Sequence, residues 1–518
     1  MISSKDSSDR KTTIKRETDI EMLFFLLIAV IILLFFVYNA QNEKPKNFPA
    51  GPKSFPLIGS LLSVGVDLKS AFQRWRCQWG DIVGFKMGSE LAIVISDFDM
   101  LQEAFKDDRF AGRPQNMQTV FRAFFERDAR EKTSGGIVFS TGEHWKEQRR
   151  FAMRTLKEFG VGKTATQTII NDEISKLVEE LRLENGKTVN LKFRTNLAVV
   201  NTLWQILNGE KSDTKNPEMM DVFRTTAEFI QENSMTGPIM ILPWLRHFPF
   251  FKAQFEKARS SPQTMRKFTS ESIKRHIDTY DDSHQRDFID CYLKKMTETT
   301  DQSSSFHGKH GEGNIQRTLM DIFGAGSETT SAILTFAFNY LTRFPDMQTR
   351  VQEEIDSVIG SRTPELVDRQ AMPYTDAVIH EVLRHSCVVY TTPHATTEEV
   401  EFHGYTIPKG TSVFANTSHI MNDPKHWDKP EEFNPDRFLD GEGNFKKNDR
   451  CIPFLVGKRY CLGQQLAQHQ LFLFLTGLLQ AFTFSTTLPH PDMVNVVPEV
   501  VGFLHTCPNY SVVISNRA

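Results

Sequence analysis

Cysteine is scarce in this sequence of 518 residues: there are six, with no Cys-x-x-Cys pair and no short spacing. The pattern indicates neither a disulfide framework nor a zinc site. An excess of positive charge is also missing, since the formal net charge is −3, so nothing in the composition argues for nucleic-acid binding. No internal repeat is found. What remains is a globular composition, rich in Phe at 42 residues, that suits one large domain or two to three smaller ones.

Long hydrophobic runs are absent apart from one, Met22 to Tyr38. Its roughly 17 residues are at the short end for a membrane-spanning helix. A cleaved signal peptide is the alternative, but no small-x-small cleavage site follows, which favours a retained anchor. We therefore predict a polar tail over 1–21, an anchor over 22–38, a proline-rich hinge over 39–56 and a catalytic domain over 57–518.

The stretch from Pro453 to Gly463 places a single cysteine, Cys461, between two glycines and just before a helical pattern from Gln464 to Leu479. Gly457 allows a tight turn, and Gly463 allows the following helix to approach a flat cofactor closely. The helix N-terminus favours an anionic sulfur, and Arg459 is a candidate partner for a carboxylate. A thiolate ligand to haem iron is the chemistry indicated, and a buried structural cysteine is the alternative.

A second stretch interrupts a long helical pattern that we predict from Asn314 to Phe344. Each interior glycine costs about 1 kcal/mol against Ala, so Gly324 and Gly326 suggest a reason for small residues. By helical spacing, one face holds Ile322, Ala325, Gly326 and Thr329. The Thr329 hydroxyl is expected to bond back to the previous turn and hold a water. Close helix packing is the alternative explanation.

Most of the remaining chain is predicted to be helical, with short strands at 81–87, 91–95, 397–407 and 510–514. The polar segment 299–314 is predicted to be a loop. The segment from Pro238 to Phe251 is very apolar for a loop with three prolines, and we favour a patch in contact with a membrane over a buried loop. The fold class is mainly α with a small β-rich part.

The set Phe454, Gly457, Arg459, Cys461 and Gly463 resembles the haem-binding signature of the cytochrome P450 family. The resemblance covers nearly all of the chain from Pro45 onward. It implies the cytochrome P450 fold and haem b with Cys461 as the axial ligand. It also implies a cytosolic catalytic domain at the endoplasmic reticulum membrane. The Lys and Arg residues of the tail would instead place the tail itself in the cytosol, a conflict that a start at Met22 would remove.

The resemblance assigns further residues to the cofactor site and its support. A Glu-x-x-Arg pair, closed by a later arginine, implies a structural network of Glu381, Arg384 and Arg437. Partners of the haem propionates are implied at Arg113, Trp145, Arg149 and His394. Glu328 and Thr329 fall in the family's oxygen-groove motif, with proton delivery as their implied role.

Residues of the substrate pocket are implied in three segments: Phe121, Phe124 and Phe125; Ile322, Ala325 and Gly326; Val389 and Tyr390. The chain looks like the microsomal drug- and steroid-metabolising branch. Two of these segments depart from it, because the span from Arg113 to Trp145 is longer and the loop after Arg384 lacks the usual proline. The identity of the substrate therefore does not carry over.

The resulting hypothesis is a membrane-anchored haem-thiolate monooxygenase. It would act on an apolar substrate such as a steroid, fatty acid, terpenoid or xenobiotic. Electrons would come from NADPH through a flavin reductase, with cytochrome b5 as an optional partner. One alternative is a haem-thiolate isomerase or dehydratase that uses peroxides without a reductase. The other is a non-catalytic haem sensor.

Overall fold

The predicted N-terminal segments lie mostly outside what the structure shows. The polar tail, 1–21, is not among the described residues, and the predicted anchor is represented by Met22 and the helical residues 25–33 alone. Across the described chain, no helix combines the length and the apolar character that crossing a bilayer requires. The computed structural model describes Met22, 25–33, 45–65, 67–125, 135–158, 164–210, 217–232, 237–486, 499–501, 504–508 and 510–517.

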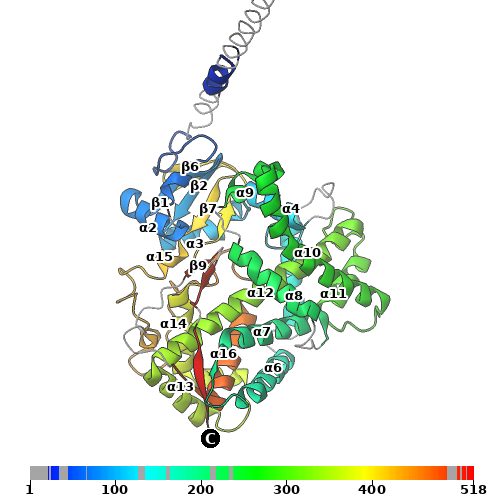
Figure 1. Ribbon diagram of the computed structural model, residues 1–518, viewed down its shortest axis with the longest axis vertical. Coiled ribbons are helices and arrows are strands. Elements are labelled where there is room, and N and C mark those ends of the chain that lie inside the picture. The colour runs from blue at the N-terminus through cyan, green and yellow to red at the C-terminus, as the bar shows by residue number, and fades with distance from the viewer. Residues whose placement is uncertain are drawn as a thin grey trace, which may run out of the picture.

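Helix α12 (Gly308–Arg343) runs through the centre of the molecule, with α7 (Leu191–Asn208) and α16 (Gln464–Ala481) packed beside it (Figure 1). Its second half is surrounded by other elements, and Leu334 and Phe336 are fully buried. The helix ends just before Pro345, which begins α13 instead (Pro345–Val358), because proline fits the first turn of a helix but not its interior.

The predicted loop 299–314 is partly wrong, since α12 begins at Gly308 rather than Asn314. Three glycines lower the helix propensity of this stretch, but tertiary contacts outweigh them. Gly311 lies so close to the carbonyl of Phe306 that a side chain would not fit. Asn314 donates to the Ser305 carbonyl at 2.8 Å. These contacts fix the first turns of the helix.

The other helices surround α12 and extend the body on both sides (Figure 1). Buried residues of α6, α12, α13, α14 and α16 share one core with β8 and β11, and a second core joins the main sheet to α2 and α3. Their bounds are α2 (Leu68–Trp79), α3 (Phe98–Lys106), α4 (Gln115–Phe125), α5 (Gly142–Glu158), α6 (Thr164–Arg182), α8 (Pro217–Glu232), α10 (Pro249–Asp278), α11 (Phe288–Glu298), α14 (Pro373–Ser386) and α15 (Thr417–Ile420).

Within the described residues, the strands form one sheet of four and three smaller sheets, in keeping with the predicted small β-rich part. In the larger sheet, with order β1-β2-β7-β4, β2 and β7 pair in parallel, and the other neighbours are antiparallel. All four predicted strand regions are present. The bounds are β1 (Ile82–Met87), β2 (Glu90–Ile95), β3 (Thr188–Val189), β4 (Pro393–Ala395), β5 (Val400–Phe402), β6 (Tyr405–Ile407), β7 (Ser412–Ala415), β8 (Phe482–Ser485), β9 (Glu499–Val501), β10 (Leu504–Thr506) and β11 (Val512–Asn516).

The segment from Pro238 to Phe251 is not a loop, which corrects the prediction. It forms α9 (Pro238–Ile241), the 3-10 helix η3 (Pro243–His247) and the start of α10. Each of the three prolines occupies the first turn of one of these elements, where its missing N–H has no partner to lose. The prolines were interpreted as helix breakers in the sequence, whereas in the structure each one begins a helix.

Candidate functional site: a cysteine loop beside a buried arginine cluster

The loop that carries Cys461 rests on the C-terminal end of α3. Gly457 has a φ of +80°, and a side chain there would collide with the Phe105 carbonyl. The next amide, of Lys458, donates to that carbonyl at 2.8 Å, and the Cys461 amide donates to the Phe454 carbonyl at 2.9 Å. Only glycine meets both the conformation and the close approach at position 457. These bonds hold Cys461 at the start of α16.

Opposing influences act on the Cys461 thiol. Burial raises its pKa, whereas the backbone amides of Gly463 and Gln464 and the positive charge of Arg149 lower it. The two amides belong to the first turn of α16, where unpaired N–H groups and the helix dipole favour an anion. Burial outweighs the other influences, so the pKa of Cys461 lies above its usual value, and a bound metal would be needed to favour the thiolate.

Three arginines converge next to this loop. Arg459 is buried and donates to the carbonyls of Ala111 and Ser140 at 2.7 and 2.6 Å. Arg113 donates to the Pro393 carbonyl at 2.8 Å, and Arg149 to the Tyr460 carbonyl at 2.7 Å. Every one of these acceptors is a neutral main-chain carbonyl, so the contacts orient the guanidinium groups without neutralising them.

Burial and mutual repulsion make this cluster unfavourable by itself. The pKa of Arg113 is lowered to about 10, by burial first and then by the charge of Arg149, although the charge of Asp321 acts in the opposite direction. The pKa of Arg459 lies well below its usual value, because of burial first and then the charges of Arg113 and Arg149. An anion with several oxygens would relieve both effects.

His394 supplies an independent sign of a missing polar partner. The ring is 1% exposed and stacks on Phe105 with centroids 3.8 Å apart. Neither ring nitrogen has a hydrogen-bond partner of normal geometry among the described residues. Burial, followed by the charges of Arg113 and Arg459, holds the pKa of His394 well below its usual value. A neutral histidine with unpaired nitrogens beside buried cations fits the edge of a group that carries carboxylates.

Trp145, on α5, lies against the same cluster. Its side chain is 5% exposed, and the guanidinium carbon of Arg459 lies 3.9 Å from the ring centroid. Arg149, one turn later on α5, stacks over Tyr460 at 4.8 Å. The structure therefore brings together the five predicted residues Arg113, Trp145, Arg149, His394 and Arg459.

On α12, the predicted groove residues divide between two faces. The Thr329 hydroxyl donates to the Ala325 carbonyl at 2.8 Å, as expected, and Ala325 is exposed although its helix is central. Gly326 differs: a side chain there would meet Leu203 of α7, so this glycine serves close helix packing. Burial raises the pKa of Glu328, whose carboxylate accepts from Asn196 of α7 at 3.3 Å. Glu328 thus belongs to the contact between α7 and α12.

The predicted aromatic pocket residues form a stack on α4. Phe121 packs on Phe139 with centroids 3.8 Å apart, and Phe124 on Phe255 at 5.0 Å. The Arg317 guanidinium lies 3.4 Å from the Phe125 centroid. The fourth predicted aromatic residue, Tyr390, lies in the loop after α14 and has different neighbours.

Tyr390 is 3% exposed and stacks on His505 of β10 with centroids 5.0 Å apart. Val389 beside it is partly buried against the core. In this loop the Tyr390 ring therefore contacts the β9–β10 hairpin.

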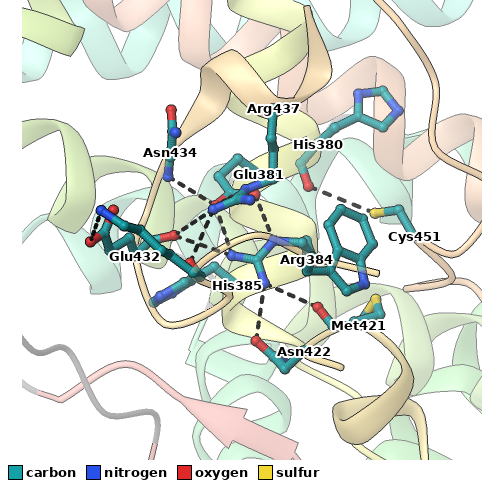
Figure 2. Close-up of polar contacts among 12 residues, drawn as sticks. His380, Glu381, Arg384, His385, Met421, Asn422, Glu432, Asn434, Arg437 and Cys451 are labelled. Carbon is teal, nitrogen blue, oxygen red and sulfur yellow. Dashed lines mark hydrogen bonds and ion pairs between the residues drawn. The ribbon is translucent and has the colours of Figure 1, made fainter. Parts of the chain in front are cut away.

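The predicted ion network is complete and buried (Figure 2). Glu381 and Arg384 are both 0% exposed and form two bonds, of 2.7 and 2.8 Å. Arg437 donates to Glu381 at 3.0 Å, and the Asn434 amide adds a bond of 2.9 Å. Arg384 also donates to the Met421 carbonyl at 3.0 Å, so every charge is both paired and hydrogen-bonded.

Two residues with a part in this site were missed by the sequence analysis. Asp321 accepts from the Ile137 and Val138 amides at 2.7 and 2.9 Å, and Asn314 accepts from Gly136 at 3.1 Å. Asp321 could have been noticed as an acidic residue within an apolar stretch of the predicted helix, one turn before Ala325. Its partners lie more than 180 residues earlier, beyond the reach of local patterns.

Comparison with known proteins identifies the family of the chain. The family model described as Cytochrome P450 matches residues 49–513. Rabbit (Oryctolagus cuniculus) "Cytochrome P450 2B4" is 34% identical over 504 residues, which cover 95% of this chain and 99% of the relative. Rat (Rattus norvegicus) "Cytochrome P450 2C7" is 34% identical over 505 residues, covering 95% and 98%. "Cytochrome P450 2C26" of Mesocricetus auratus is 35% identical over 502 residues, covering 94% and 98%.

The chain belongs to the cytochrome P450 family, and it is a monooxygenase. Its mainly helical fold with small sheets is consistent with that family, which implies haem as the cofactor. The alternatives of a peroxide-using isomerase and of a haem sensor find no support here.

Proposed function

We propose that the Cys461 sulfur would ligate the iron of haem b in this monooxygenase and that the arginine cluster would hold the two propionates. The observation that carries this is the convergence of three guanidinium groups, one buried and two half-buried, with unpaired His394 beside the cysteine loop. Arg113, Arg149 and Arg459 would bind carboxylates, and Trp145 and His394 would add N–H donors. When bound, the haem supplies the activation of dioxygen, which thiolate donation favours.

The roles of the other residues follow from their contacts. Amides of Gly463 and Gln464 stabilise the anionic sulfur, and the Glu381 network keeps the preceding chain in place. Thr329, bonded to the Ala325 carbonyl, offers its oxygen as an acceptor to a water beside α12. Glu328, with its raised pKa, exchanges protons from the α7 side of the same helix turn.

Apolar substrate would lie over the haem between α4, α12 and the loop after α14. Apolar contact is offered by the ring stack of Phe121, Phe124 and Phe125, by Ile322 and the exposed Ala325 on α12, and by Val389. This lining suits a steroid, a fatty acid, a terpenoid or a xenobiotic. We propose NADPH as the electron source, through a flavin reductase and with cytochrome b5 as an optional second donor.

An exposed apolar face supports attachment to the endoplasmic reticulum membrane. Trp244, Phe248 and Phe250 are 47, 53 and 78% exposed. Leu57 is 47% exposed, and its carbonyl flanks Gly88 together with Ile241 of α9, so the two segments adjoin. With the chain before Pro45 as anchor, this face would rest on the cytosolic surface of the bilayer.

Reconstitution tests the proposal. Purified protein with a flavin reductase and NADPH should consume NADPH with a bound apolar compound and form a product containing one atom of labelled dioxygen. Difference spectra with steroids, fatty acids, terpenoids and xenobiotics identify the class that displaces the water on iron. Turnover of a peroxide without reductase or NADPH, and none with them, would contradict the proposal.

A further inference from the structure

The chain segment 135–140 is held by α12 through its amides. Asp321 accepts from the amides of both Ile137 and Val138 with the same carboxylate oxygen, at 2.7 and 2.9 Å. A side chain at Gly136, whose φ is +79°, would collide with that oxygen. Asp321 is 7% exposed, so these are buried, charge-assisted bonds.

The same segment faces the arginine cluster with its carbonyls. Val138 accepts from Nε of Arg113 at 2.8 Å. Ile137 and Ser140 accept from the two terminal nitrogens of Arg459, at 3.3 and 2.6 Å. One short stretch of backbone therefore connects a carboxylate on α12 with two of the three arginines of the cluster.

Asp321 also acts on Arg113 through its charge. Among the groups that act on the pKa of Arg113, burial and Arg149 lower it, and Asp321 raises it. Asp321 therefore offsets part of the positive charge at Arg113, although its hydrogen bonds go to amides and its nearest cation is Arg317, 3.7 Å away on the same helix. The amides stay aligned between the negative oxygen on one side and the cations on the other, which strengthens both sets of bonds.

We propose that Asp321 is a positioning residue for haem binding: it holds segment 135–140 so that its carbonyls direct Arg113 and Arg459 toward the propionates. The inference rests on the proposed function, because it takes these arginines as propionate partners. Asp321 touches neither the haem nor the substrate in this role. It acts through two peptide groups and through its charge.

Asp321→Asn tests the role, with Asp346→Asn, at an exposed site on α13, as the matched control. Haem transfer from the loaded protein to a haem-free globin should be about 10- to 100-fold faster in Asp321→Asn and unchanged in the control. The reduction potential should rise, since a negative charge near the iron is lost, and amide exchange at Ile137 and Val138 should accelerate. Asp321→Ser, which keeps an acceptor without the charge, serves if the first variant accumulates poorly.

A double-mutant cycle with Arg113→Gln separates positioning from general loosening. If Asp321 acts through Arg113, the effects of Asp321→Asn on haem transfer and potential should shrink in the Arg113→Gln background. Equal effects in both backgrounds, or an unchanged potential, would overturn the inference while the propionate assignment stands. If Arg113→Gln alone changes neither quantity, the propionate assignment itself is wrong, and the role of Asp321 is overturned with it.

Discussion

Cys461 differs from Cys387 in exposure as well as in surroundings, because part of Cys461 remains accessible to solvent whereas Cys387 is buried. Burial raises the pKa of Cys387 to about 12, with little opposition from nearby charges. At Cys461, burial is opposed by two helix-terminal amides and by Arg149. A thiol placed in this way can give up its proton to a metal, whereas Cys387 serves as an apolar core residue.

Replacement of the ligand gives the first prediction. Cys461→His should keep some haem but lose the strongly red-shifted Soret band of the reduced carbon-monoxide complex, because thiolate donation causes that shift. Absorbance spectra of the reduced protein with carbon monoxide provide the measurement, and Cys77→Ser, at an exposed site on α2, is the control. A wild-type band in the Cys461 variant would mean that another group ligates the iron.

The Thr329 hydroxyl gives the second prediction. Thr329→Ala should continue to consume NADPH while product falls and hydrogen peroxide rises, since the water bound to that hydroxyl would no longer be held for proton transfer. Thr335→Ala is the matched control, because its hydroxyl makes the same type of bond, to the Ser331 carbonyl, two turns later. Product, NADPH and peroxide are measured together, and unchanged coupling would reduce Thr329 to a packing residue.

At the scale of elements, the Glu381 network joins α14 to the segment that precedes the cysteine loop. Removal of Arg384 leaves the buried Glu381 carboxylate with one cation fewer, which costs about 3–5 kcal/mol. Arg384→Ala should therefore yield little haem-loaded protein, as measured by the ratio of haem absorbance to total protein. A well-loaded variant with slow turnover would instead place Arg384 in the chemistry.

A second tie between elements joins α10 to α11. His276 donates to Asp287 at 2.8 Å, and both side chains are almost fully buried. Burial alone would lower the pKa of His276, but the bonds to Asp287 and to the Ser272 carbonyl outweigh it and raise the pKa above 6.5. The stabilisation is thus complete below the unfolded value and is lost as the pH rises through the raised folded value.

The His276→Gln variant tests this sign. Its thermal unfolding temperature should fall furthest below wild type at about pH 6 and approach it by about pH 8. His284→Gln, at an exposed site in the same connection, should show no such trend. A difference that grows with pH would mean that His276 is neutral in the folded protein.

What the sequence could predict depended on how far apart the partners lie. The cysteine loop, the Glu-x-x-Arg pair and the long helix each form patterns within a few residues, and their elements are present. The sequence analysis missed the Asp321 contact, whose partners lie more than 180 residues away. It also missed the start of α12, where local contacts to Ser305 and Phe306 outweigh the low helix propensity of three glycines. Gly326 is a third case. The helical periodicity predicted that it lies in a helix, but it did not predict that Leu203 of α7 would pack against it.

At the scale of the whole molecule, the charge around the cysteine side bears on electron delivery. The net charge is −3, yet Lys146, Arg150, Arg154 and Lys157 are on α5, and Lys458 is on the cysteine loop. Lys458 and Arg154 are partly offset by Asp108 and Glu158. Arg150 is exposed. Arg149 is not counted among these surface cations, because it donates to the Tyr460 carbonyl. An acidic reductase surface would be attracted to this face.

Turnover driven by the reductase should therefore fall as ionic strength rises, and the double variant Lys458→Glu/Arg150→Glu should slow it further. Turnover driven by added peroxide, which bypasses the reductase, should change little. Lys267→Glu, at an exposed site on α10, is the control for a charge change elsewhere. If the double variant lost reductase-driven and peroxide-driven turnover equally, the fold would be damaged, and the proposal that the reductase docks on this face would be wrong.

The contacts of Arg459 also set an order of events during synthesis. Its three carbonyl partners precede it by 348, 322 and 319 residues. At about 5–20 residues per second, a ribosome needs roughly 15 to 70 seconds to cover that interval. Throughout it, the early segments exist without the guanidinium that joins them, and Cys461 has not yet been made. Stable capture of the prosthetic group must therefore await the last stage of translation or follow release of the chain.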